Sequence, residues 1–308
     1  DNIISNNAAG DGGSGGGIDS DSGSVIISGN TIKNNEAGGR GGGIKGRDTG
    51  TQILNNIIQG NKAVEGGGLA GGGTVTGNTI IANTAERGGG VYATDSAMPL
   101  SNNYILSNTA SGSGGGIVSE GIDQNFAITG NVIAGNVSDG IGAAIRLSAE
   151  VNVIKNTIFN NQGSNIIDNY NFTDSAIKYE NNIIVGNKTT GSYAVLFRTH
   201  PSYGNDNILF NSNTIYDNGG TYELSNQGAL SMGVLNAENN YWGTDDASAI
   251  ATKIHDWNDD SSYDFVDYTP HTSTIISSNP ITPPSGLSAQ TGPTTMQLSW
   301  TANSESDI

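Results

Sequence analysis

The sequence predicts an all-β fold, a parallel β-helix built from stacked coils. Three observations predict it: 46 of the 308 residues are glycine, asparagine is abundant, and short blocks recur along the chain. Self-similarity at a period of 20 to 50 residues is typical of solenoids. The apolar runs are too short for helices and are bounded by Gly or Asn, so we expect strands.

The first element of each repeat is a glycine-rich turn followed by a short strand. It reads Gly-Gly-Gly-aliphatic, as in Gly41-Gly42-Gly43-Ile44 and Gly88-Gly89-Gly90-Val91, and becomes degenerate after residue 140. Glycine supplies the positive φ that tight bends require. A second short apolar stretch follows, such as Gln52-Ile53-Leu54. These two elements predict two strands of each coil.

The third element is the pattern Asn-x-aliphatic-x-x-Asn. It recurs from Asn30 to Asn213 in seven steps of roughly 26 residues, so we expect about nine to ten coils of three strands each. Asparagines at the same bend of successive coils can hydrogen-bond along the stack. We therefore interpret the asparagine columns as structural.

The array is predicted to end near residue 270. Ile250, Ile254 and Trp257 have helical spacing, which predicts a capping helix over 247–257. Such a cap, followed by Phe265 to Tyr268, would cover the terminal cross-section of the core. Residues 271–283 are rich in Thr, Ser and Pro and are interpreted as a linker.

These blocks resemble the right-handed parallel β-helix superfamily of pectate and alginate lyases, and the repeats of polymorphic outer-membrane adhesins. The resemblance covers roughly residues 1–270 and implies a right-handed helix. Residues 284–308, with Leu287 and Trp300, resemble the opening of a fibronectin type III domain. Only the first part of such a sandwich is present, so we expect a fragment of a longer modular protein that is extracellular or at the surface of a prokaryotic cell.

Composition restricts the function. Twelve Lys and Arg against 29 Asp and Glu give a net charge of −17, which argues against nucleic acid as a partner. The absence of Cys excludes thiolate sites and cysteine nucleophiles. No apolar run has the length of a membrane span. A polysaccharide or cell-surface glycan is the expected partner, as the resemblance implies.

Candidate substrate-binding residues follow the glycine-rich turns. The position after the aligned aliphatic residue holds Lys45, Tyr92 and Arg146, in a column that continues to Ile167. Alternation along a strand places this column on the outer face. It forms either a glycan-binding face or a solvated strand surface with isolated long side chains.

Candidate catalytic residues are Arg198, His200 and Tyr203, with Asp206 as a cation ligand. Basic groups, a phenol and a carboxylate are what a uronate lyase needs for β-elimination. A chance grouping in an irregular coil is the competing interpretation. No other cofactor is indicated, and calcium bound by acidic columns or by Asp245 to Asp267 is a further hypothesis. The leading hypothesis is a non-catalytic adhesive or structural scaffold with polysaccharide contact, and the alternative is a polyuronate-type lyase.

Overall fold

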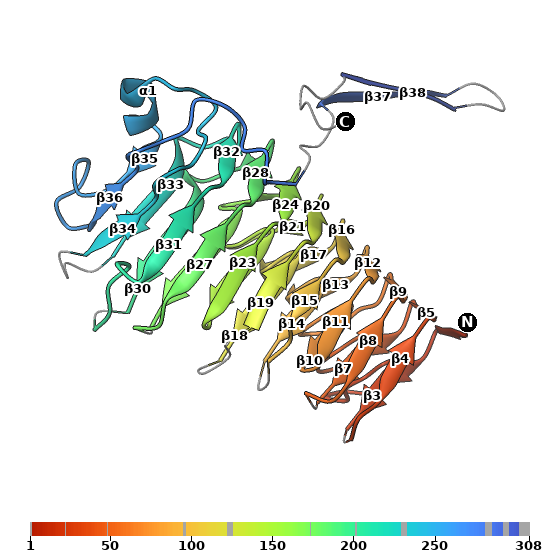
Figure 1. The fold of residues 1–308 in the computed structure, drawn as a ribbon. Coiled ribbons are helices and arrows are strands. Elements are labelled where there is room, and N and C mark those ends of the chain that lie inside the picture. Colours follow the sequence, from red (N-terminus) through yellow and green to blue (C-terminus); the bar gives the residue numbers. More distant parts are fainter. Residues whose placement is uncertain are drawn as a thin grey trace.

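The computed structural model is a parallel β-solenoid with one short helix near its C-terminal end (Figure 1). It describes residues 2–21, 23–47, 49–94, 97–121, 126–172, 174–200, 202–228, 233–280, 285–291 and 296–301. Each coil passes through the same sheets in the same order, and each strand pairs in parallel with its counterpart in the next coil. The predicted fold class is therefore confirmed.

Sheet 1 is formed by the Asn-x-aliphatic-x-x-Asn blocks. Its nine strands, in spatial order, are β1 (Ile3–Ser5), β5 (Thr31–Lys33), β9 (Ile57–Gln59), β12 (Thr79–Ile81), β16 (Tyr104–Leu106), β20 (Val132–Ala134), β24 (Thr157–Phe159), β28 (Ile183–Val185) and β32 (Thr214–Tyr216).

Sheet 2 follows the glycine-rich turns. Its ten strands are β3 (Ile18–Ser20), β7 (Ile44–Gly46), β10 (Leu69–Gly71), β14 (Val91–Ala93), β18 (Ile117–Glu120), β22 (Ile145–Ser148), β26 (Ile167–Asn171), β30 (Tyr193–Thr199), β33 (Tyr222–Gln227) and β35 (Ile254–His255).

Sheet 3 is formed by the remaining apolar stretches. Its ten strands are β4 (Ile26–Ser28), β8 (Gln52–Leu54), β11 (Thr74–Thr76), β15 (Leu100–Ser101), β19 (Phe126–Thr129), β23 (Val151–Ile154), β27 (Ile177–Glu180), β31 (Ile208–Asn211), β34 (Val234–Asn236) and β36 (Phe265–Asp267).

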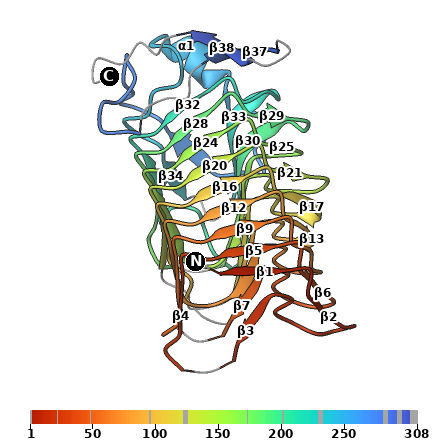
Figure 2. The same cartoon turned by 90° about the vertical axis from the view of Figure 1, so that its right-hand side faces the viewer.

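A fourth set of short strands, which the sequence did not predict, lies between sheet 1 and sheet 2 in most coils (Figure 2). Sheet 4 contains β13 (Thr84–Arg87), β17 (Thr109–Ser113), β21 (Val137–Ser138), β25 (Gln162–Gly163) and β29 (Lys188–Thr189). The pair β2 (Ala8–Ala9) and β6 (Glu36–Ala37) occupies the equivalent position in the first coils. These strands are polar on their exposed side, so they carry no clear apolar signal.

Two asparagine ladders run along the stack and confirm the structural interpretation of these columns. In the middle of one ladder, the Oδ1 atom of Asn108 accepts from the backbone N–H of Asn83 at 2.9 Å and from its Nδ2 at 3.0 Å. Asn108 Nδ2 in turn donates to the carbonyl of Ile80 and to Asn136 Oδ1, both at 3.0 Å. The ladder thus satisfies polar groups that would otherwise be buried without partners.

Glu223 terminates this ladder at the C-terminal end. Its carboxylate accepts from Asn218 Nδ2 at 2.7 Å and from the Asn218 backbone N–H at 3.4 Å, and the side chain is buried. Burial raises the pKa of the Glu223 carboxyl above its ordinary value, and the hydrogen bonds from Asn218 offset this only in part.

The raised pKa of Glu223 predicts a pH dependence. A carboxyl that binds its proton more tightly in the folded than in the unfolded chain destabilises the fold where it is ionised, and this penalty disappears as pH falls through the folded pKa. The melting temperature of the wild type, relative to that of Glu223→Gln, should therefore rise between pH 7 and pH 5. A parallel decline of both proteins over this range, measured by circular dichroism, would contradict the assignment.

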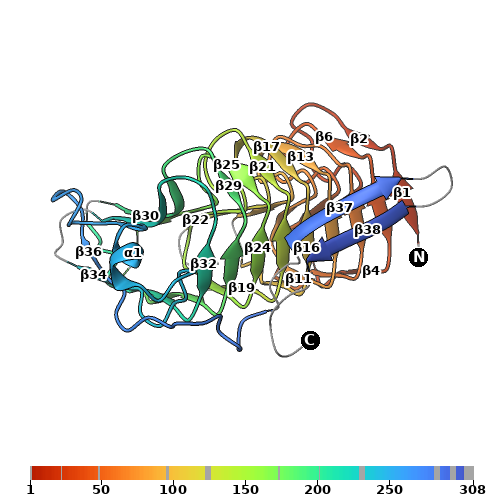
Figure 3. The same ribbon diagram turned by 90° about the horizontal axis from the view of Figure 1, so that it is seen from above.

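The C-terminal end is closed differently from the prediction. Helix α1 spans only Ala247–Ala251, with Asp246 accepting from the N–H groups of Ser248 and Ala249 at its N-cap. Ile254 leaves the helix to pair with Leu224 at the edge of sheet 2. Trp257, expected on the same helical face, is 43% exposed and stacks on Phe265. The helix over 247–257 was thus too long, because strand pairing takes over after residue 253. Figure 3 shows α1 at the opposite end of the stack from β1.

Residues 271–280 lie against the solenoid. Ser278 Oγ donates to Asn181 Oδ1 at 2.9 Å, and the Asn279 amide and the Thr214 hydroxyl lie 3.0 Å apart. Thr214 lies on the outer face of sheet 1 and is fully buried where this segment contacts it. Beyond it, β37 (Ser285–Thr291) and β38 (Met296–Thr301) form an antiparallel pair. Residues 281–284 and 302–308, and the side chains of Leu287 and Trp300, lie outside what the structure describes.

Candidate binding face on sheet 2

The structure aligns Lys45, Tyr92 and Arg146 in one column on the outer face of sheet 2. Lys45 is in register with Ala70, Tyr92 with Val118, and Val118 with Arg146. The aliphatic residues before them, such as Ile44 and Val91, point inward and are fully buried.

The column then continues differently from the prediction. Arg146 is in register with Asp168, whereas Ile167 pairs with Ile145 in the core. The degenerate block is shifted by one residue, because Asn165 aligns with Ala143 and hydrogen-bonds to Gly142 with its side chain. This shift places the Asp168 carboxylate, in place of the expected Ile167, beside Arg146.

An alternating series of charged side chains runs along this face over several coils. Arg40 Nε lies 2.8 Å from Glu65 Oε2, and Arg87 Nη1 lies 3.0 Å from Glu65 Oε1. Arg87 and Arg146 both contact Glu120. We call these five residues, together with Asp168 and Arg198, the charged face.

Tyr92 lies beneath this series and is only 3% exposed. The guanidinium carbons of Arg87 and Arg40 lie 5.1 and 5.7 Å from its ring centroid, and its hydroxyl donates to Glu120 at 3.0 Å. Burial raises the pKa of the Tyr92 phenol. A ligand on this face would therefore meet the arginines rather than the Tyr92 ring.

The glycine-rich turns explain why an outward-facing tyrosine is covered. Gly88 has a φ of +64°, and a Cβ placed on it would lie 2.4 Å from the Val91 carbonyl oxygen and 3.0 Å from the Tyr92 Cβ. The turn therefore folds back over the strand that follows it. This places the preceding residue, Arg87, above the face of sheet 2.

Asp168 and Arg198 form the best buried ion pair of the face. Arg198 Nη2 and Nε lie 2.6 and 3.1 Å from Asp168 Oδ1, and the Asp168 side chain is 1% exposed. The Arg198 guanidinium also lies 5.7 Å from the Tyr170 ring centroid. Burial raises the pKa of the Asp168 carboxyl, and the hydrogen bond and charge of Arg198, with a smaller contribution from Arg146, act in the opposite direction.

Removing Arg198 should leave a buried carboxyl without its main partner. We expect Arg198→Ala to destabilise the fold by about 2 kcal/mol at pH 7, because it leaves the buried Asp168 charge unpaired. The expected loss is not larger because the Arg198 side chain is itself partly exposed to water. The loss should become smaller as pH falls, because burial raises the pKa of the Asp168 carboxyl and protonation removes the unpaired charge. Arg47→Ala, which breaks the exposed pair with Asp21, is the control and should change stability by less than about 1 kcal/mol. Equal effects of the two variants in urea unfolding would refute this role of Arg198.

The four residues of the predicted catalytic segment do not form one contact network. Arg198 turns to Asp168, whereas His200 and Tyr203 contact each other, with ring centroids 5.8 Å apart. The His200 carbonyl accepts from the Tyr203 N–H at 2.9 Å, and the His200 ring atom Nδ1 accepts from the Ser202 N–H at 3.3 Å. Asp206 is exposed.

A group of aromatic rings that the sequence analysis did not single out lies at the C-terminal end of sheet 2. It comprises Tyr193, Tyr222, His255 and Tyr263, which we call the aromatic patch. Tyr193 and Tyr222 are stacked at 5.8 Å, and the His255 ring lies within 4.8 to 5.5 Å of the other three rings. Tyrosines in register on two successive coils, Tyr193 and Tyr222, are the sequence signal that could have revealed it.

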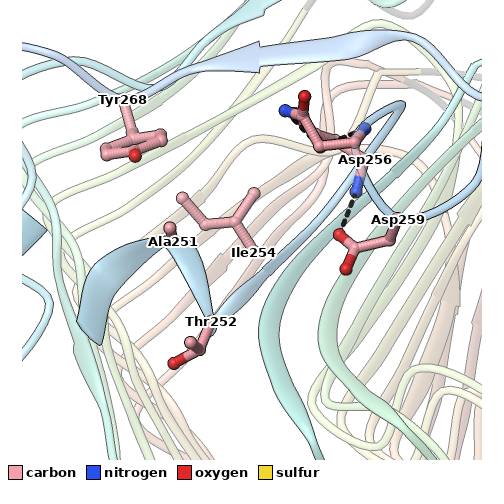
Figure 4. Close-up of a pocket in the computed structure, with 7 residues that line it drawn as sticks. Ala251, Thr252, Ile254, Asp256, Asp259 and Tyr268 are labelled. Carbon is pink, nitrogen blue, oxygen red and sulfur yellow. Dashed lines mark hydrogen bonds between the residues drawn. The ribbon is translucent and has the colours of Figure 1, made fainter. Parts of the chain in front are cut away.

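A cavity of about 310 Å³ lies beside the C-terminal cap (Figure 4). It is lined by Ala251, Thr252, Ile254, Asp256, Asn258, Asp259 and Tyr268. The Asp256 carboxylate already accepts from the N–H groups of Asn258 and Val266, both at 2.9 Å. Its hydrogen bonds therefore serve to hold the loop.

Within the described ranges, no three His, Asp or Glu residues gather as a metal site would require. The described residues therefore provide no set of ligands for the hypothesised calcium ion. No helix in the described part of the chain is both long and apolar enough to cross a membrane. Comparisons of the chain with protein-family models, with curated proteins and with solved structures gave no match.

Proposed function

We propose that the chain is a rigid scaffold of an extracellular or cell-surface protein and that the outer face of sheet 2 contacts polysaccharide. The observation that carries the proposal is the charged face, which extends over successive coils of a regular stack. A linear polymer can follow such a face, whereas the described cavity beside the cap measures only about 310 Å³ and its Asp256 carboxylate already accepts hydrogen bonds from the loop.

The composition of this face supports a binding role. It holds four of the five arginines of a chain whose net charge is −17. Elsewhere the acidic surface repels polyanions such as nucleic acid. Guanidinium groups and carboxylates together offer many donors and acceptors to the hydroxyl groups of a glycan.

The arrangement favours a scaffold over a polyuronate lyase. A lyase needs a base, an acid and a cation that neutralises the substrate carboxylate, all directed at one carbon atom. Arg198 is paired with Asp168, and His200 and Tyr203 contact each other instead. Incubation with pectate or alginate and Ca²⁺ should give no ultraviolet-absorbing unsaturated product. If product did form, and if Ala substitution of Arg198, His200 or Tyr203 abolished it, the lyase alternative would replace the scaffold.

We propose further that residues 284–308 begin a fibronectin type III domain, which would make the solenoid one module of a larger protein. The antiparallel pairing of β37 with β38 supports this, since the first two strands of such a sandwich pair in this way.

Polysaccharide contact is tested by affinity electrophoresis of the purified chain through gels that contain single soluble polysaccharides. The proposal predicts slower migration in at least one gel. Unchanged migration in a broad panel that includes neutral, uronate and sulfated polymers would contradict it and leave a purely structural module.

A further inference from the structure

The aromatic patch lies on the same outer face as the charged face. His255 follows the buried Ile254 on β35 and therefore points outward, and its Nδ1 lies 3.1 Å from Ser225 Oγ. The tyrosine rings that contact His255 must lie on this side of sheet 2 as well. The patch is separate from the core aromatic residues, which are Tyr179, Phe197, Phe210 and Trp242.

The patch adjoins the Asp168–Arg198 pair through Gln227. Gln227 is in register with Arg198 on the neighbouring strand. Its side chain is near enough to Tyr193 to act on the pKa of that phenol, lowering it against the larger, raising effect of burial. All four rings are half-buried and thus present part of their surface to solvent. The strands hold aromatic faces and an amide side by side on a rigid sheet.

The charges near the patch are compensated. Arg198 pairs with Asp168, Arg146 and Arg87 with Glu120, and Arg40 with Glu65. Each of these arginines already has a carboxylate partner, so a uronate or sulfate group would have to displace that partner. The net charge of the chain would add a general repulsion.

We propose that the aromatic patch, with Gln227 and Arg198, binds an uncharged polysaccharide. This inference rests on the proposed function and names its ligand class. The apolar C–H faces of neutral sugar rings pack on tyrosine rings, and the phenol, amide and guanidinium groups hydrogen-bond to the sugar hydroxyls. Because an uncharged polymer forms no ion pair with the protein, binding should be insensitive to salt.

The test compares affinity electrophoresis in gels with neutral polymers (dextran, galactomannan, mixed-linkage β-glucan) and with uronate polymers (alginate, pectate). Retardation by at least one neutral polymer, at low and at physiological salt alike, is expected. Retardation by uronate polymers alone would overturn this inference but leave the proposed function standing. No retardation by any polymer would overturn both.

Single substitutions test whether the polymer binds at the aromatic patch. Tyr222→Ala should weaken binding to the retarding polymer about tenfold, the loss typical of a central aromatic contact. Tyr104→Ala is the matched control, because Tyr104 is 53% exposed on sheet 1, away from the patch. Tyr263→Ala, in the loop after β35, is a second variant that removes one ring without altering a strand. If both patch variants keep their melting temperatures and bind like the wild type, the site is wrong.

Discussion

Replacing Asn108 with alanine should lower the stability of the solenoid by about 4 kcal/mol. The substitution leaves four groups without their partner: the backbone N–H and Nδ2 of Asn83, the Ile80 carbonyl and Asn136 Oδ1. Each buried group that loses its hydrogen bond costs about 1 to 3 kcal/mol, and some of the four keep a second partner. The melting temperature should fall by roughly 10 °C.

The control for Asn108 belongs to the same ladder. Asn7 is exposed at the first coil, where its N–H and Nδ2 donate to Asn35 Oδ1. Water can replace its side chain, so Asn7→Ala should cost less than about 1 kcal/mol. Similar losses in the two variants, measured by thermal unfolding, would mean that the ladder does not stabilise the core of the stack.

Replacing Gly89 with alanine should be almost as damaging, at about 3 kcal/mol. A Cβ at this position would lie 2.5 Å from the Thr109 carbonyl oxygen and 2.6 Å from that of Gly115. Both are backbone atoms of the next coil, so neither can move without breaking the parallel pairing. Overpacking of this kind typically lowers the stability of a protein by about 1 to 3 kcal/mol, and occasionally by more.

Gly10 provides the matched control for Gly89. A Cβ placed on Gly10 would meet no atom within 4 Å. Gly10→Ala should therefore unfold at the same temperature as the wild type or slightly above it. A Gly89→Ala protein with unchanged melting temperature would show that the coils are less tightly stacked than the structure has them.

The asparagine ladders and the sheets that follow them could be predicted because their residues repeat at nearly constant spacing. Each buried polar column needs the same residue in every coil, so the physical requirement is visible in the sequence itself. The strands of sheet 4 could not be predicted in this way. In Thr84–Arg87 only Ala85 is buried, which leaves no apolar pattern to detect.

The candidate site was harder to predict because it depends on register. Asp168 meets Arg146 only through the one-residue shift in the degenerate turn, and Arg198 meets Asp168 across two strands of different length. The aromatic patch combines residues from three strands and a loop, and coil lengths vary in that region. Likewise, the spacing of Ile254 and Trp257 is compatible with a helix. The helix ends earlier because β35, which contains Ile254, pairs with β33, and this pairing cannot be seen in the sequence.

Hydrogen–deuterium exchange in the presence of the most strongly retarding polysaccharide tests whether glycan binds the outer face of sheet 2. We expect added protection in peptides that cover β30, β33 and β35, and unchanged exchange in peptides that cover β9, β12 and β16 of sheet 1. Protection confined to sheet 1, or to neither sheet, would contradict it.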